Sequence, residues 1–267
     1  MKRVLLLMII GLTTTIAFGQ KKESRQVSGF TGIDASGVFD ITVSKGNTES
    51  LTVEADDAVM PYVRSEVKNG VLRLYIDNNS NKLRSINNIK AYVVMKDLDN
   101  ITLSGACKLT TNDLFSPDKF KSDCSGASVL TLNVNTGQLS VVMGGASKIV
   151  MNANVTGDVD LNISGASKFK GELKSSDVTL DCSGVSSIEL TGSAKNLKLD
   201  ASGISKVDAE DFTVKTANVE SSGTSNVTVN VTDALNVNSS GLSSVNYKSS
   251  SAKINLISSK MSKVRKL

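Results

Sequence analysis

The sequence contains no histidine and no tryptophan, and only 4% of its 267 residues are aromatic. Without histidine there is no Ser-His-Asp or Cys-His nucleophile pair, no imidazole general base and no imidazole metal site. An enzyme built from this chain would have to rely on carboxylates, lysine, tyrosine or serine. Proline is scarce as well, with two residues against 20 glycines. We therefore predict no catalytic residue, no metal ligand and no cofactor.

Neither sign of charge dominates the chain. Thirty Lys and Arg residues stand against 26 Asp and Glu, a formal net charge of +4, and two of the positive residues lie in an N-terminal segment that we expect to be removed. The remaining excess is too small to indicate a nucleic-acid partner. With 40% hydrophobic residues and a mean hydropathy of -0.02, the composition is that of a soluble chain with a sizeable core.

Residues 1–19 have the pattern of a secretory signal peptide. Lys2 and Arg3 form a positive start, residues 4–12 are apolar, and Ala17-Phe18-Gly19 is a small-x-small cleavage site before Gln20. The apolar run is shorter than the roughly 20 residues that span a bilayer. No cysteine lies near the cleavage site, and no later stretch is apolar enough to be transmembrane. We therefore expect an exported protein in the periplasm, on the outer-membrane surface or outside the cell.

A repeat of about 19 residues organises the chain from residue 101 onward. Its core is Ser-Gly-Ala-Ser-Lys, and its glycines are Gly105, Gly126, Gly145, Gly165, Gly184, Gly203, Gly223 and Gly241. A ninth copy spans residues 259–264, with Lys260 in the glycine position. A fixed period of this length predicts a solenoid.

The apolar columns of the repeat identify the kind of solenoid. Counted from the glycine, positions -6, -4 and +4 are apolar in nearly every copy, and the residues between them are polar. An apolar residue at every second position is the period of a half-buried strand. We therefore predict an all-β fold, a parallel β-helix of about nine regular coils of 19–20 residues, about 4.8 Å apart. The glycine supplies a backbone conformation or a tight corner between two strands, and the flanking serines stack as structural hydroxyls, not as nucleophiles.

Residues 20–100 are less regular, and we expect irregular N-terminal coils and a cap of the β-helix there. The stretch 33–43 fits the repeat and predicts an early coil, and residues 51–55 and 71–76 alternate like strands. The polar segment 56–69 is expected to hold a short helix interrupted near Pro61, and residues 77–88 a polar loop. At the other end, basic residues load the last coil with charge, which we interpret as protection of the sheet edge.

The stretch from Phe30 to Val43, followed by Leu51–Ala55, Val71–Leu74 and the serial Ser-Gly-Ala-Ser-Lys turns, resembles the GIN-domain family of auto-transporter adhesin heads. The resemblance covers residues 26–265. It implies a right-handed parallel β-helix exported into a Gram-negative envelope, with a role in adhesion. It offers no catalytic or binding residue to carry over, and Lys260 departs from its glycine pattern.

Two groups of side chains are candidates for a chemical role, as a metal site or as disulfide partners. Asp123, Asp181, Asp200 and Glu220 share the outward position -3, where stacked carboxylates about 5 Å apart suggest either a weak Ca²⁺ site or a solvated face, and we favour the solvated face. Cys107, Cys124 and Cys182 are expected to be buried free thiols, with a Cys107–Cys124 bridge as the less favoured alternative. Cys124 and Cys182 share one column three coils apart, beyond disulfide reach.

Three functions remain open. The first is a non-enzymatic β-solenoid that acts in adhesion or interaction with a protein or glycan at a cell surface. The second is a polysaccharide-active lyase or hydrolase, which rests on analogy of fold alone. The third is a structural or stress component of the envelope that binds no ligand. Absent catalytic groups and the expected export favour the first.

Overall fold

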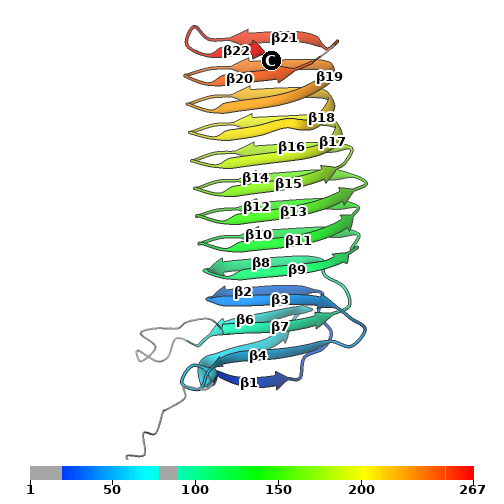
Figure 1. The fold of residues 1–267 in the computed structure, drawn as a ribbon, viewed down its shortest axis with the longest axis vertical. Helices are drawn as coiled ribbons and strands as arrows, with labels where there is room; N and C mark the ends of the chain where they lie inside the picture. Colours follow the sequence, from blue (N-terminus) through cyan, green and yellow to red (C-terminus); the bar gives the residue numbers. More distant parts are fainter. Residues whose placement is uncertain (1–19, 78–88, 250) are drawn as a thin grey trace, which may run out of the picture.

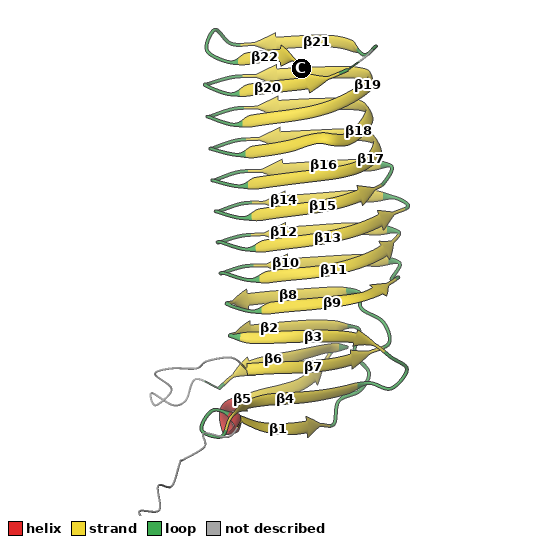
Figure 2. Ribbon diagram, in the orientation of Figure 1, coloured by secondary structure: helices red, strands yellow, loops and turns green. Residues whose placement is uncertain are grey.

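The computed structural model describes residues 20–77, 89–249 and 251–267 of the chain. The predicted signal peptide, residues 1–19, and most of the predicted polar loop 77–88 lie outside the described residues. Within the described part, strands dominate, and the one helical element is a single 3-10 turn, η1 (Met60–Tyr62), drawn in red in Figure 2. None of its helices is long and apolar enough to cross a membrane.

The strands stack into a rod, with the C-terminus at one end (Figure 1). The N-terminal strands are β1 (Gln20–Arg25), β2 (Gly32–Gly37), β3 (Phe39–Lys45), β4 (Ser50–Asp56), β5 (Val63–Lys68), β6 (Val71–Ile76) and β7 (Ile89–Met95). The coils that follow contain β8 (Asn100–Gly105), β9 (Lys108–Phe115), β10 (Lys119–Cys124), β11 (Val129–Thr136), β12 (Gln138–Met143), β13 (Lys148–Val155), β14 (Asp158–Ile163), β15 (Lys168–Lys174) and β16 (Asp177–Cys182). The last coils contain β17 (Ser187–Ala201), β18 (Lys206–Ser221), β19 (Asn226–Ser239), β20 (Ser244–Lys248), β21 (Lys253–Ser258) and β22 (Lys263–Lys266).

Each regular coil contributes two strands that face each other across the core. One series of parallel pairings runs β2–β8–β10–β12–β14–β16 and continues through the second halves of β17, β18 and β19 to β21. The other runs β3–β9–β11–β13–β15 and continues through the first halves of β17, β18 and β19 to β20 and β22. The predicted all-β solenoid of stacked parallel coils is therefore confirmed.

Alternation of polar and apolar residues puts the core between the two series of strands. In β14, the residues Val159, Leu161 and Ile163 are at most 2% exposed, while the two residues between them are exposed. The same columns repeat in the neighbouring strands, with Leu139 paired to Val159 and Val141 to Leu161. Each coil therefore adds several buried apolar residues to columns that run along the rod, and their burial stabilises the stack.

In the N-terminal region, the order of the strands along the rod differs from their order in the sequence. The coil made by β6 and β7 lies below the coil of β2 and β3, which itself pairs with β8 and β9 (Figure 1). Strand β4 pairs antiparallel with both β7 and β1, so β1 forms the outer edge. The nearly buried carboxylate of Glu54 accepts hydrogen bonds from Lys22 and Lys90, which ties these three strands together.

One detail of this region differs from the sequence-based expectation. In the polar segment 56–69 the short helix expected near Pro61 is only the 3-10 turn η1, and residues 63–68 form strand β5, which pairs antiparallel with β6. The connection is Asn69-Gly70, both with positive φ, 53° and 75°. Such a pair forms the tight turn of a two-residue hairpin. The predicted early coil, by contrast, is present as β2 and β3.

Candidate functional site

The turn between the two strands of each coil is closed by the repeated glycines. Eight of them, from Gly105 to Gly241, have φ between 66° and 78°, the left-handed region that side chains disfavour. Each lies directly over the glycine of the preceding coil. A Cβ on Gly126 would be 2.4 Å from the carbonyl oxygen of Gly105, and one on Gly165 would be 2.4 Å from that of Gly145. The predicted role of the glycines is therefore confirmed.

The repeated serines hold the same turn together. In seven of the eight turns a buried serine stands two residues after the glycine, and in six of these its hydroxyl donates to the carbonyl of the residue before the glycine, as in Ser128 to Ser125 (2.7 Å) and Ser167 to Ser164 (2.7 Å). Contacts between coils also occur, as from the Ser164 hydroxyl to the Met143 carbonyl at 3.0 Å. These hydroxyls satisfy backbone acceptors at a tight bend, which is a structural use.

The acidic column lies where the repeat predicts it. Asp181 pairs with Asp200, and Asp200 with Glu220, on adjacent parallel strands, and all three are exposed. Val142 and Asn162 separate Asp123 from Asp181 in the same column. Among the residues that the structure describes, no three His, Cys, Asp or Glu side chains are placed to hold a metal ion. The hypothesis of a Ca²⁺ site in this column therefore gains no support.

All three cysteines are buried and unpaired, as expected. Cys124 and Cys182 share one inward column, with Met143 and Ile163 between them. Burial raises the pKa of Cys124 to about 12 and that of Cys182 to about 11, and it also raises the pKa of Cys107. Neutral thiols in an apolar core are unreactive.

We expect the native protein to leave its three thiols unlabelled by iodoacetamide at pH 8, with no disulfide in its non-reduced mass, and to label all three after unfolding. The thiols ionise near pH 9 when unfolded, whereas Cys124 and Cys182 keep their protons when folded. The folded state thus binds more protons between pH 9 and 11, and the free energy of unfolding falls as pH rises through that window. Urea denaturation at pH 8 and pH 10 measures the fall. The double variant C124A/C182A should show a smaller one, and rapid labelling of the native protein would contradict the assignment.

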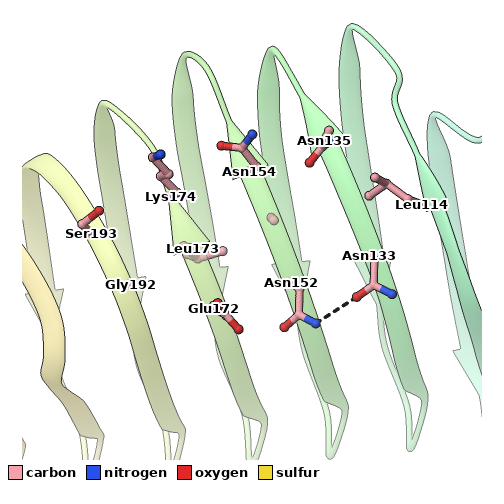
Figure 3. A pocket seen from close by; sticks show the side chains of 11 residues that line it. Leu114, Asn133, Asn135, Asn152, Asn154, Glu172, Leu173, Lys174, Gly192 and Ser193 are labelled. Atoms are coloured by element: carbon pink, nitrogen blue, oxygen red, sulfur yellow. Dashed lines mark hydrogen bonds between the residues drawn. The ribbon is translucent and has the colours of Figure 1, made fainter.

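The outer face of the second series of strands carries a trough that the sequence analysis did not identify. It has a volume of about 410 Å³ and crosses β9, β11, β13, β15 and β17 (Figure 3). Parallel pairing places Asn133, Asn152 and Glu172 in one outward column. Asn135, Asn154, Lys174 and Ser193 form a second outward column. The two columns form the walls of the trough.

The floor and one end of the trough contain residues that depart from the repeat. Ala153 and Gly192 are small residues in the column between the walls, where Val134 and Leu173 stand in other coils. Between β9 and β11 the register shifts after Thr131, which brings Leu114 opposite Asn133 at one end, with 47% of its surface exposed. The repeated Asn-x-Asn of residues 133–135 and 152–154, one coil apart, is the signal in the sequence that could have revealed the walls.

The stacked coils, the glycine turns and the two facing series of strands define the chain as a parallel β-helix. A family model matches residues 29–157 and 152–251, and its description is "Putative auto-transporter adhesin, head GIN domain". The chain belongs to this family, as its resemblance in sequence implied. No curated protein matches the chain.

Solved structures share the fold at low sequence identity. A "putative adhesin" from Parabacteroides merdae is 17% identical with a TM-score of 0.66, over 93% of this chain and 96% of that one. A "putative adhesin" from Parabacteroides distasonis is 19% identical with a TM-score of 0.65, over 94% and 98% of the two chains. A "putative lipid binding protein" from the same organism is 15% identical with a TM-score of 0.62, over 93% and 96%. At these identities the likeness concerns the fold alone, and the names differ, so function must be argued from the surface.

Proposed function

We propose that the protein is an exported, non-enzymatic adhesin that binds a molecule at a cell surface through the outside of its β-helix. Membership of a family of adhesin heads supports the general role. The use of its reactive side chains supports the absence of catalysis, since the three cysteines and the serines after the glycines are buried in the turns and the core. The pattern of residues 1–19 supports export.

One feature of the surface carries the proposal. Val185, Ile204 and Leu242 follow the repeat glycine in the C-terminal coils, and Met261 follows Lys260 in the glycine position. Each of the four side chains is 60–64% exposed. Backbone hydrogen bonds stack these turns, as from the Ile204 N–H to the Gly184 carbonyl at 2.7 Å. The side chains therefore project from one edge of the rod, where Thr224 lies between Ile204 and Leu242. Aligned exposed apolar side chains are typical of an interaction surface, because a solvated edge gains nothing from them.

Surface exposure on intact cells is the decisive test. We expect trypsin to remove the protein from intact cells that express it, because adhesion requires an accessible rod, and the mature chain to begin at Gln20 by N-terminal sequencing. A periplasmic protein with a known location is the control for membrane integrity. Protection from trypsin, together with a deletion strain that adheres normally, would overturn the proposal and favour an envelope structural role. Activity on a uronate polymer that is lost in D200A would instead support an enzyme.

A further inference from the structure

The trough on the outer face offers hydrogen-bonding groups that the fold does not use. Asn133 and Asn152 are joined, with the Asn152 amide donating to the Asn133 side-chain oxygen at 2.9 Å (Figure 3). Within the described parts of the chain, the structure records no side-chain hydrogen bond for Asn135 or Asn154, one coil apart in the other wall. Their amides can each donate and accept, so they are available to a ligand.

The charges of the trough balance. Glu172 and Lys174 lie on β15 in opposite walls, and both are exposed. Among the ion pairs found between described residues, neither takes part in one. One carboxylate and one ammonium give the trough no net charge, and a ligand of high charge of either sign would meet repulsion from one of them. A neutral ligand that both donates and accepts hydrogen bonds fits this lining.

The lining of the trough presents similar groups from one coil to the next along the rod. Its walls present a polar side chain from each successive coil, about 4.8 Å apart, and its five strands span roughly 19 Å along the axis. A linear chain of units, each about as long as one coil is high, would meet a similar pair of polar groups at every unit. A chain of sugar rings satisfies this description.

One end of the trough supplies an apolar contact. The Lys45 ammonium donates to the Leu114 carbonyl at 3.1 Å, and the Lys45 N–H donates to the Asp113 carboxylate at 2.7 Å. These contacts hold the bulge of β9 that turns Leu114 outward. A fixed, exposed leucine can pack against the C–H face of a sugar ring, and holding it in place beforehand lowers the entropic cost of binding.

We propose that the trough binds a neutral, linear oligosaccharide lying parallel to the axis of the β-helix, with Asn135, Asn152, Asn154, Glu172 and Lys174 as its hydrogen-bonding residues. The assignment rests on the proposed function, because it names the class of molecule that the adhesin recognises. It places the oligosaccharide on the flat outer sheet, a second surface that shares no residue with the apolar edge on which the proposed function rests.

The test uses the purified chain from Gln20 to Leu267. Isothermal titration would be run with neutral hexasaccharides of glucose, mannose and galactose, and with a uronate oligomer and a sulfated oligomer as anionic comparators. We expect one or more neutral oligomers to bind, and N152A/N154A to weaken binding roughly tenfold or more, since several hydrogen bonds are lost. N246A is the matched control, because the Asn246 amide donates to Asn226 at 3.3 Å in a similar exposed pair outside the trough. Its affinity should equal that of the wild type.

Circular dichroism and the thermal midpoint should be unchanged in N152A/N154A, because both side chains are exposed. Failure of every neutral oligomer to bind would overturn the inference, while trypsin accessibility and cell adhesion would still decide the proposed function independently. Binding that N152A/N154A leaves intact would also overturn it, by placing the ligand elsewhere. Preferential binding of the uronate or sulfated oligomer would overturn the assignment of a neutral ligand.

Discussion

Replacing Gly145 by alanine is expected to lower the free energy of unfolding by about 2–4 kcal/mol. Gly145 has a φ of 68°, and a Cβ there would lie 2.5 Å from the carbonyl oxygen of Gly126 and 2.9 Å from its nitrogen. Both atoms belong to backbone, which cannot rotate away. The same carbonyl accepts a hydrogen bond of 2.7 Å from the Ala146 N–H, so any shift that relieves the clash also weakens the contact between coils.

The neighbouring glycine provides a matched control. Gly144 has no positive φ, and a Cβ there would meet only the Ser164 hydroxyl oxygen, at 3.8 Å. Most other coils have serine in this position. G144A should therefore differ from the wild type by less than about 0.5 kcal/mol. Urea denaturation followed by far-ultraviolet circular dichroism measures both variants, and equal midpoints for G145A and G144A would show that the stacked glycines tolerate a side chain.

The regular coils could be predicted in detail because the repeat samples each position many times. A single Ser-Gly pair says little, but eight copies with apolar residues at fixed offsets leave only one register. Strand pairing follows that register, as in Leu161 with Leu180 and Asp181 with Asp200. In the last turn, where Lys260 replaces the ninth glycine, the backbone hydrogen bonding includes a contact within the turn. There the Ser262 N–H donates to Ser259 at 3.2 Å, within its own turn.

The N-terminal region could be predicted only in part, because no repeat constrains it. The position of the β6–β7 coil below β2 and β3 depends on long-range antiparallel pairing with β4, which leaves no local pattern in the sequence. Strand β5 did leave one. Val63, Ser65 and Val67 alternate with charged residues ahead of Asn69-Gly70, which is a strong hairpin signal, and the expectation of a helix near Pro61 overlooked it.

The trough was missed because its shape depends on exceptions to the repeat. The Asn-x-Asn pairs are visible in the sequence, but exposed asparagines are ordinary on a β-helix. Ala153 and Gly192 line the hollow between its two walls, and the bulge in β9 turns Leu114 outward at one end. Such a bulge adds residues to one coil. In the repeat pattern these residues only lengthen the spacing between two glycines, so they do not indicate a bulge. Departures from the repeat are therefore the places to search for binding sites in related chains.

In the core, Phe169 and Gly171 depart from the residues of the adjacent coils. Substitutions at these two positions give the second large expected effect. Phe169 is 2% exposed and pairs with Ile149 and Ile188 in the adjacent coils. Its ring extends over Gly171, whose added Cβ would lie 2.6 Å from the ring Cε1. Glycine at 171 therefore makes room for the ring. We expect F169A to lower the free energy of unfolding by about 3–5 kcal/mol, because it leaves a cavity that glycine cannot fill.

The adjacent coil supplies the control for this prediction. It has Ile188 and Leu190 where this coil has Phe169 and Gly171. G171L alone should destabilise by about 1–3 kcal/mol through overpacking against the ring. In F169I/G171L the pair copies the neighbouring coil, so most of the stability should return, with a coupling energy of about 1–3 kcal/mol between the two changes. Urea denaturation of the wild type, the single variants F169I and G171L, and the double variant F169I/G171L measures this coupling. If the losses of free energy in F169I/G171L were the sum of those in the single variants, the ring at position 169 and the glycine at position 171 would not depend on each other.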